Sequence, residues 1–147
     1  MRDVKFWSLG LCSLFLAGCA ARPAFEAGPT DPDAATEFTQ TESGLKYRIL
    51  RKSDGKKPSP TDMVSVHYAG WLDDLTEFDS SYRRGQPASF ALNQVVTGWT
   101  EGLQLVGEGG MIELEIPSFL GYGPGGMPGS IPPNATLHFK VELLDIR

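Results

Sequence analysis

The sequence predicts an α+β fold in which an antiparallel sheet of about five strands wraps around one short helix. The clearest observation is near the C-terminus, where Leu137, Phe139, Val141 and Leu143 alternate with polar residues. Such alternation places one side of a strand in a core and the other in water, as in antiparallel sheets. Only one stretch, roughly 98–106, shows helical spacing instead. A sheet that closes its apolar face over one helix satisfies both patterns.

Three earlier strands are predicted from the same alternation, around residues 45–50, 64–69 and 112–116. In the predicted helix, Trp99, Leu103 and Val106 share one face at spacings of four and three residues. Thr97 is expected to cap the start of this helix and Gly107 its end. The strands and the helix together form one domain, which we expect to span residues 43–147.

The N-terminus has the features of an export signal. Arg2 and Lys5 precede an uncharged run of 16 residues, 6–21, which is shorter than the ~20 residues of a membrane-spanning helix. The run contains Leu16-Ala17-Gly18-Cys19, which resembles the lipobox of bacterial lipoproteins. This resemblance implies cleavage before Cys19 and attachment of lipid to that residue. An ordinary signal peptide cut near Ala21 and an uncleaved anchor are the alternatives.

The division of the chain follows from this reading. Residues 1–18 are expected to be a signal peptide and residues 19–42, rich in Pro, Ala, Asp and Thr, a flexible tether. The domain would then be held at the cell envelope by its lipid. Ala20 after the cysteine resembles lipoproteins of an outer membrane, so the domain would face the periplasm or the cell surface.

Composition argues against several classes of function. A net charge of −5 does not suit a protein that binds nucleic acid, because phosphate contacts need clustered Lys and Arg. Both cysteines lie within the first twenty residues, and the two histidines are far apart, so no metal site is expected. The glycine-rich segment 121–126 is followed by prolines rather than by a helix, so no dinucleotide or other cofactor is expected.

Several segments of the domain carry recognisable motifs, and they occur in a fixed order. They are VHYAG at 66–70, FDSS at 78–81, VVTGWTEG at 95–102, YG at 122–123, and GSIPPNATL at 129–137 leading into FKVELL at 139–144. Together they resemble the FKBP family of peptidyl-prolyl cis–trans isomerases over about residues 43–147. The resemblance implies an FKBP-like fold and an isomerase that acts on Xaa-Pro bonds.

The resemblance also implies a site. The proline ring of a substrate would lie over Trp99, at the start of the short helix. The walls of the pocket would be Tyr68, Phe78, Val95, Val96, Ile131 and Phe139. Asp79 and Tyr122 would be the polar groups, and the backbone N–H of Ile131 would meet a substrate carbonyl. Phe90 and Leu137 are expected to be ordinary core residues. Ala88, Met127 and Ser130 differ from better-known members, so the preference for the residue before proline stays open.

The expected function is acceleration of Xaa-Pro rotation in exported proteins, which assists folding in the cell envelope. The partners would be proline-containing polypeptides and the membrane, with a macrolide as a possible ligand and a monomer as the expected state. A tethered chaperone or binding module with incidental isomerase activity is the alternative. A purely structural envelope lipoprotein is a third possibility, and it would not bind proline peptides.

Overall fold

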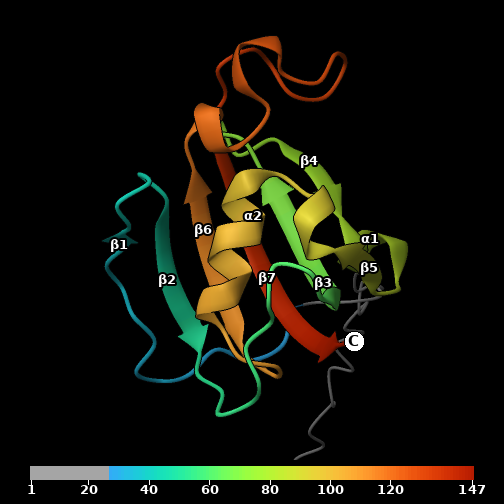
Figure 1. The fold of residues 1–147 in the computed structure, drawn as a ribbon. Coiled ribbons are helices and arrows are strands. Elements are labelled where there is room, and N and C mark those ends of the chain that lie inside the picture. Colours follow the sequence, from blue (N-terminus) through green and yellow to red (C-terminus); the bar gives the residue numbers. More distant parts are fainter. Residues whose placement is uncertain (1–26) are drawn as a thin grey trace, which may run out of the picture.

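The computed structural model describes residues 27–147, and within them seven strands form one antiparallel sheet (Figure 1). The strands are β1 Thr39–Gln40, β2 Lys46–Arg51, β3 Met63–Trp71, β4 Glu77–Ser80, β5 Ala88–Ala91, β6 Met111–Ile116 and β7 Leu137–Ile146. Their order is β1-β2-β6-β7-β3-β4, with β5 paired to β3. The predicted antiparallel sheet and its four long strands are confirmed. The sheet has more than five strands because β1, β4 and β5, of two to four residues, are too short for alternation to reveal.

Strand β7 lies in the middle of the sheet, with β6 on one side and β3 on the other. Phe139 of β7 stands opposite Leu114 of β6 and Gly70 of β3. A Cβ atom on Gly70 would lie only 2.6 Å from Cε1 of Phe139 and 2.7 Å from Cζ of Phe78. Glycine at this position therefore allows both aromatic rings to approach the strand.

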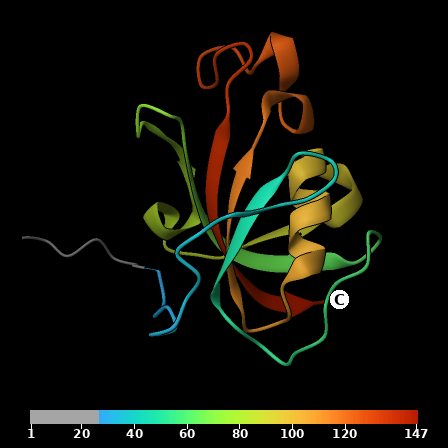
Figure 2. The ribbon, with the colours of Figure 1, turned by 90° about the vertical axis from the view of Figure 1, so that its left-hand side faces the viewer.

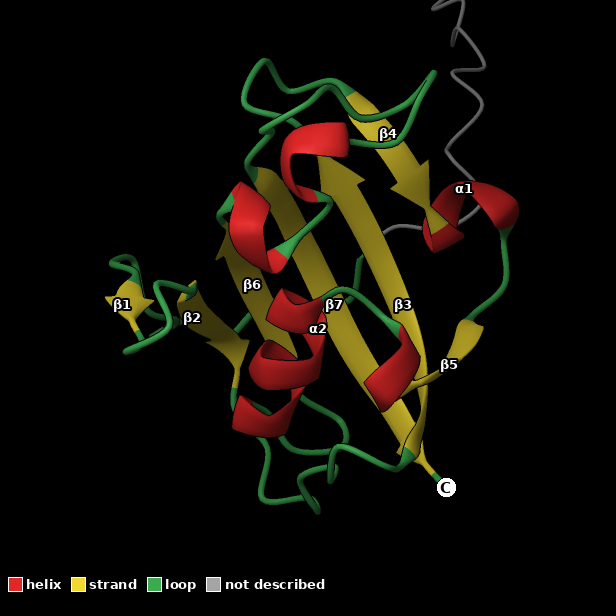
Figure 3. Cartoon of the chain, turned by 45° about the horizontal axis from the view of Figure 1, so that its top comes forward, coloured by secondary structure: helices red, strands yellow, loops and turns green. Residues whose placement is uncertain are grey.

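The helices are α1 Ser81–Arg84 and α2 Thr97–Gly102, with 3-10 turns at η1 Leu92–Gln94, η2 Leu103–Leu105, η3 Ser118–Leu120 and η4 Gly123–Gly125. Helix α2 lies across the face of the sheet (Figure 3), close to β6. A Cβ atom on Gly98 would lie 2.6 Å from Ile116, and one on Gly102 would lie 2.6 Å from Leu114. The two glycines let the helix backbone come close to the sheet.

The predicted helix over residues 98–106 is too long. The α-helix ends at Gly102, and the chain then tightens into the 3-10 turn η2, as is common at helix ends. Thr97 is the first helical residue and not a cap, because the cap position belongs to Val96, which makes no side-chain cap bond. The buried face itself is confirmed, since Trp99 and Leu103 belong to the core.

Residues 27–42 are bound to the domain, which corrects the predicted tether for this part of the chain (Figure 2). The N–H of Gly28 donates to Glu142 Oε1 at 2.8 Å, and the N–H of Asp31 donates to the carbonyl of Leu50 at 2.8 Å. Strand β1 then pairs with β2. A polar, proline-rich segment can do this because its backbone groups satisfy the open edge of β2. We call residues 28–36 the N-terminal strap.

Glu142 holds the strap to the sheet from a buried position. Its carboxylate accepts the hydroxyl of Tyr82 at 2.5 Å and Nη2 of Arg51 at 2.9 Å, in addition to the N–H of Gly28. Arg51 also donates from Nη1 to the carbonyl of Pro29 at 3.0 Å. Burial alone would raise the pKa of Glu142, but these hydrogen bonds and the charge of Arg51 outweigh it, so the pKa is lowered.

The predicted signal peptide and Cys19 lie outside the described residues. Within residues 27–147, no helix combines the length and apolar character that crossing a membrane requires.

Candidate active site

A cleft of about 510 Å³ opens between α2, β4 and the loop that precedes β7. Its lining consists of Tyr68, Phe78, Asp79, Phe90, Gln94, Val95, Val96, Trp99, Tyr122, Met127, Ser130, Ile131 and Phe139. The structure thus brings together all nine residues that the sequence assigns to the site, although they come from segments up to 71 positions apart. A concave, mainly apolar lining with a few polar groups is typical of a binding site for a small group.

The floor of the cleft is the indole ring of Trp99, which is 4% exposed. Three aromatic rings stand edge-to-face around it. Tyr68 lies 5.2 Å away, Phe139 5.2 Å and Phe90 5.6 Å between ring centroids. Such T-shaped contacts fix ring positions and leave little room for rotation. The floor is therefore apolar and rigid.

The prediction for Phe90 was incomplete, because this side chain packs against the core as expected but also lines the cleft. Leu137, the other residue expected in the core, is fully buried there. Met127 and Ser130, expected at the rim, do line the cleft, whereas Ala88 does not contribute to the lining.

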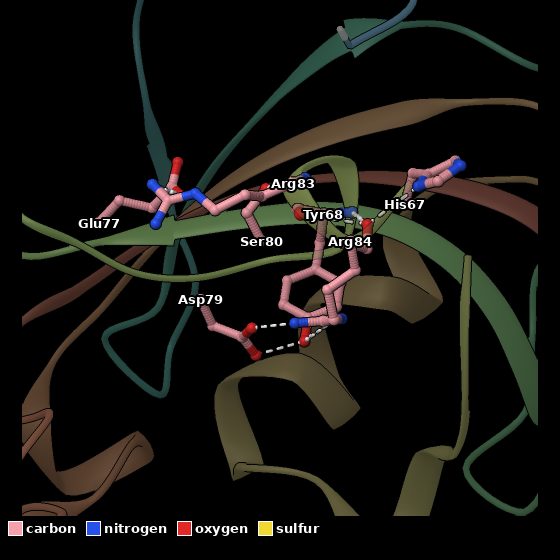
Figure 4. A network of polar contacts seen from close by, with 8 residues as sticks. His67, Tyr68, Glu77, Asp79, Ser80, Arg83 and Arg84 are labelled. Atoms are coloured by element: carbon pink, nitrogen blue, oxygen red, sulfur yellow. Dashed lines mark hydrogen bonds and ion pairs between the residues drawn. The ribbon is translucent and has the colours of Figure 1, made fainter. Parts of the chain in front are cut away.

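One wall of the cleft carries a paired carboxylate (Figure 4). One carboxylate oxygen of Asp79 accepts a hydrogen bond from the hydroxyl of Tyr68. The other oxygen forms an ion pair with Nη1 of Arg84. Arg84 Nη2 also donates to the hydroxyl oxygen of Tyr68 at 3.0 Å. Burial would raise the pKa of Asp79, but the bonds from Tyr68 and Arg84 lower it below its ordinary value. The carboxylate is therefore charged at neutral pH.

Arg84 was not predicted as a site residue. It lies at the end of the one-turn helix α1, five residues after Asp79, and its guanidinium carbon lies 5.6 Å from the ring centroid of Tyr68. The motif FDSS ends at Ser81, the first residue of this turn, and so does not reach Arg84. Three residues that meet only in space, Tyr68, Asp79 and Arg84, form the polar wall.

Tyr68 is also held from behind. The buried hydroxyl of Ser81 accepts the backbone N–H of Tyr68 at 2.7 Å. The same hydroxyl lies 2.9 Å from Nδ1 of His67, which extends to the other side of the sheet (Figure 4). Because both the backbone and the hydroxyl of Tyr68 are bonded, its ring has a fixed orientation in the cleft.

The backbone N–H of Ile131, predicted as a donor toward the substrate, is bonded within its own loop. The N–H of Ile131 donates to the carbonyl of Met127 at 2.8 Å, and the N–H of Met127 donates to the carbonyl of Ile131 at 2.8 Å. The predicted role of the Ile131 N–H toward a substrate is therefore wrong for this structure, because the bond closes the loop on itself. The side chain of Ile131 still lines the cleft.

Two other donors remain available at the cleft. In the described part of the chain, neither the hydroxyl of Tyr122 nor the backbone N–H of Val96 has a hydrogen-bond partner, and the buried indole N–H of Trp99 has none either. Burial and the nearby charge of Asp79 raise the pKa of Tyr122, so its hydroxyl keeps its proton at neutral pH. Both groups can donate hydrogen bonds to substrate carbonyls. The N–H of Val96 was not predicted, because a free backbone donor leaves no signal in the side-chain sequence.

The arrangement resembles known proteins in sequence and in fold. Residues 54–144 match the family of FKBP-type peptidyl-prolyl cis-trans isomerases. The FkpA isomerase of Aeromonas hydrophila is 56% identical over 106 residues, which cover 72% of this chain and 39% of that protein. The FKBP-type 22 kDa isomerase of Escherichia coli is 52% identical over 106 residues, 72% of this chain and 52% of that protein. The alignments thus span about half or less of these curated relatives.

Solved structures agree. The crystal structure of FkpA from Escherichia coli matches with a TM-score of 0.74 and 47% identity, over 77% of this chain and 53% of that chain. The structure of AtFKBP13 matches with a TM-score of 0.70 and 31% identity, over 76% of this chain and 99% of that chain. The sheet, the short helix and the matched residues lead to one conclusion: this chain belongs to the family of FKBP-type peptidyl-prolyl cis-trans isomerases.

Proposed function

We propose that the chain catalyses cis–trans rotation about Xaa-Pro bonds in exported polypeptides. The observation that carries this proposal is the cleft with a tryptophan floor, three aromatic rings around it and one paired carboxylate in its wall. A proline ring fits such an apolar floor, and the peptide around it has donors within reach.

The reaction requires only a modest stabilisation of its transition state by the protein. Rotation about a peptide bond crosses a barrier of ~18–20 kcal/mol because it breaks amide resonance. A thousandfold acceleration needs about 4 kcal/mol of preferential binding to the transition state. The twisted amide is less dipolar than the planar one, so the apolar floor over Trp99 favours it. No bond is broken, and no proton has to leave the protein.

The polar groups would orient the substrate. Tyr122 and the N–H of Val96 can donate to the carbonyls that flank the proline, which holds the chain while the amide rotates. Asp79 has both oxygens occupied by Tyr68 and Arg84, so it acts first as a positioning residue for the ring of Tyr68. Its negative charge also contributes to the field in the cleft.

The location of the protein is part of the proposal. Cys19 would carry lipid after removal of residues 1–18, which is supported by the positive start, the apolar run and the Leu-Ala-Gly-Cys motif. The domain would then act as a monomer at the envelope, on the periplasmic side or the surface of an outer membrane. The cleft, of about 510 Å³, also has room for part of a macrolide ligand.

The test is the rate of cis-to-trans conversion of a Leu-Pro tetrapeptide with the purified full chain. We expect kcat/KM to fall at least tenfold in Trp99→Ala and several-fold in Tyr122→Phe, because the first removes the floor and the second a donor. Asp73→Asn, at an exposed carboxylate outside the cleft lining, is the matched control and should not change the rate.

A folded parent that gives no acceleration with several residues before proline would refute the isomerase. Assistance to the refolding of a proline-free protein, in the absence of isomerase activity, would instead support the chaperone alternative.

A further inference from the structure

The one-turn helix α1 is bonded on both faces of the sheet. It follows the edge strand β4 directly and packs against β3 (Figure 3). Arg84, its last residue, points into the cleft, where it bonds Asp79 and the hydroxyl of Tyr68 (Figure 4). Tyr82, two residues earlier, does not line the cleft and is bonded on the opposite face of the sheet, which we call the outer face. A contact made by α1 on the outer face can therefore affect the position of a cleft residue.

Tyr82 has two partners on the outer face. Its ring stacks on the imidazole of His67, with ring centroids 5.0 Å apart and ring planes 14° from parallel. Its hydroxyl donates to Oε1 of Glu142 at 2.5 Å. His67 on β3 and Glu142 on β7 stand opposite each other in the register of these neighbouring strands. The ring and the hydroxyl together hold Tyr82 against both strands.

The hydrogen bond from Tyr82 to Glu142 is a strong one. Both residues are buried, with exposed fractions of 8% and 7%. Burial and the neighbouring carboxylate raise the pKa of Tyr82, while the pKa of Glu142 is lowered, so a neutral hydroxyl donates to a charged carboxylate. Such charge-assisted bonds are about twice as strong as neutral ones. Arg51 and the N–H of Gly28 bond the same carboxylate, so the acceptor is itself fixed.

Helix α1 depends on such contacts because it is too short to be stable alone. It has four residues, and isolated helices shorter than about 12 residues are marginal in water. Ser80 caps its start and Gly85 its end, which shapes the turn but does not set its place on the sheet. The buried Ser81 bonds the backbone of Tyr68. The place of the turn is therefore set by Ser81 and, on the outer face, by Tyr82.

We propose that Tyr82 is a positioning residue of the isomerase and acts on the cleft through Arg84. This rests on the proposed function, because the affected step is the rotation of the Xaa-Pro bond. The anchored turn holds the backbone of Arg84 where its guanidinium meets both Asp79 and Tyr68. Without the anchor, this contact loosens and the hydroxyl of Tyr68 loses one of its two partners. A displacement of about 1 Å in a catalytic arrangement can lower the rate by up to about a hundredfold.

The first measurement is the rate of cis-to-trans conversion of a Leu-Pro tetrapeptide by variants of the full chain. Tyr82→Phe keeps the ring on His67 but removes the donor to Glu142, and Tyr82→Leu removes both contacts. We expect kcat to fall about threefold in the first variant and about tenfold in the second. KM should change little, because the apolar floor that receives the proline ring is untouched.

Two control variants separate positioning from general loss of stability. Tyr47→Phe, on β2 and outside the cleft lining, makes the same chemical change and should keep the parent rate. Leu50→Ala, at a buried residue of the same strand, lowers stability by leaving a cavity far from α1. It should also keep the parent rate under conditions in which all variants are folded.

The second measurement reports on the polar wall without relying on catalysis. Burial raises the pKa of Asp79, but the bonds from Tyr68 and Arg84 outweigh this effect and lower it. If Arg84 moves away, the pKa of Asp79 should rise. Titration of the carboxyl carbon by NMR should show this rise in both Tyr82 variants and no change in the two controls.

A double-mutant cycle tests the route. We expect Arg84→Met to lower kcat/KM about tenfold by itself, and its combination with Tyr82→Phe to lose no more than that, because the second change acts through the first residue. If the two losses multiply, Tyr82 acts by another route and the proposal is wrong.

Three further results would overturn the proposal: an unchanged pKa of Asp79 in both Tyr82 variants, an unchanged kcat in both, or a fall no larger than that of Leu50→Ala. If Tyr82→Leu does not fold, Tyr82→Phe decides, since it keeps the buried ring. Absence of isomerase activity in the parent would instead refute the proposed function. The titration of Asp79 would then still decide whether Tyr82 positions Arg84.

Discussion

Replacing Glu142 with glutamine tests how the N-terminal strap is held. The side chain of Glu142 is 9% exposed and that of its partner Arg51 is 21% exposed. In the variant, the amide oxygen can still accept from Tyr82 and Gly28, but the amide N–H₂ faces the guanidinium of Arg51. The substitution thus removes the charge-assisted hydrogen bond from Arg51 and places two donors, the amide N–H₂ and the guanidinium, against each other.

The size of the loss follows from these contacts. Hydrogen bonds to a charged group contribute about 1.5–3 kcal/mol, and breaking one side of a buried pair costs about 3–5 kcal/mol. Because Arg51 keeps its bonds to the carbonyls of Pro29 and Gly109, it is not left unpaired, and we expect a loss near 2–3 kcal/mol. Glu115→Gln, at the half-exposed pair with Lys46, is the matched control and should cost less than about 0.5 kcal/mol.

The assay is urea unfolding of the full chain at several pH values. With a slope of roughly 1–2 kcal/mol per molar urea, the midpoint of Glu142→Gln should fall by about 1–3 M at pH 7. Since folding lowers the pKa of Glu142, its contribution is present above the unfolded pKa and is lost as the pH falls through the folded value. The gap between parent and variant should therefore begin to narrow below about pH 4 and shrink further as the pH falls through the folded pKa. A midpoint shift equal to that of the control, or a gap of constant size down to pH 3, would refute the reasoning.

Three further outcomes are expected. Leu75→Gly should raise the free energy of unfolding by about 0.5–1 kcal/mol, because glycine relieves the positive φ of +67° at this position; an unchanged melting temperature would argue against strain at the turn between β3 and β4. Gly70→Ala should lower isomerase kcat/KM about tenfold with an unchanged circular dichroism spectrum, because a Cβ displaces the ring of Phe139; Gly125→Ala, whose Cβ meets nothing within 4 Å, should match the parent. The lowered pKa of Asp79 predicts a kcat/KM that is flat from pH 8 to about pH 5, and a decline that starts near pH 6 would contradict a charged, paired Asp79.

The sequence predicted the strands in which apolar and polar residues alternate over at least five positions. Strand β7 alternates from Leu137 to Leu143, and this part was predicted, whereas its last residues, up to Ile146, do not continue the pattern. Strand β1 has two residues, and it forms because Thr39 and Gln40 can pair with β2, which composition does not reveal. The N-terminal strap is polar and rich in proline, a composition typical of a free segment. It is attached in part through Glu142, more than a hundred residues later, and a contact between positions so far apart is not visible in the sequence.

The side chains of the site were predicted only in part. Resemblance located residues such as Trp99 and Tyr68, because they lie within motifs. Arg84 could not be found in this way, since its link to Asp79 depends on the turn of α1. The N–H of Ile131 was misassigned because backbone donors are decided by local loop geometry, which here pairs it with Met127.

The central place of β7 has a consequence for how the protein is made. Tyr68 on β3 faces Val141 on β7, 73 residues later, and β6 also needs β7 as its neighbour. The middle of the sheet is thus missing until residues 137–146 are available, and contacts of such long sequence separation form slowly. A chain that is delivered N-terminus first, by synthesis or by export, stays unfolded until nearly all of it has emerged. If the chain is exported as proposed and leaves during its synthesis, it would pass a narrow channel before its domain can fold, and the cleft would form on the far side.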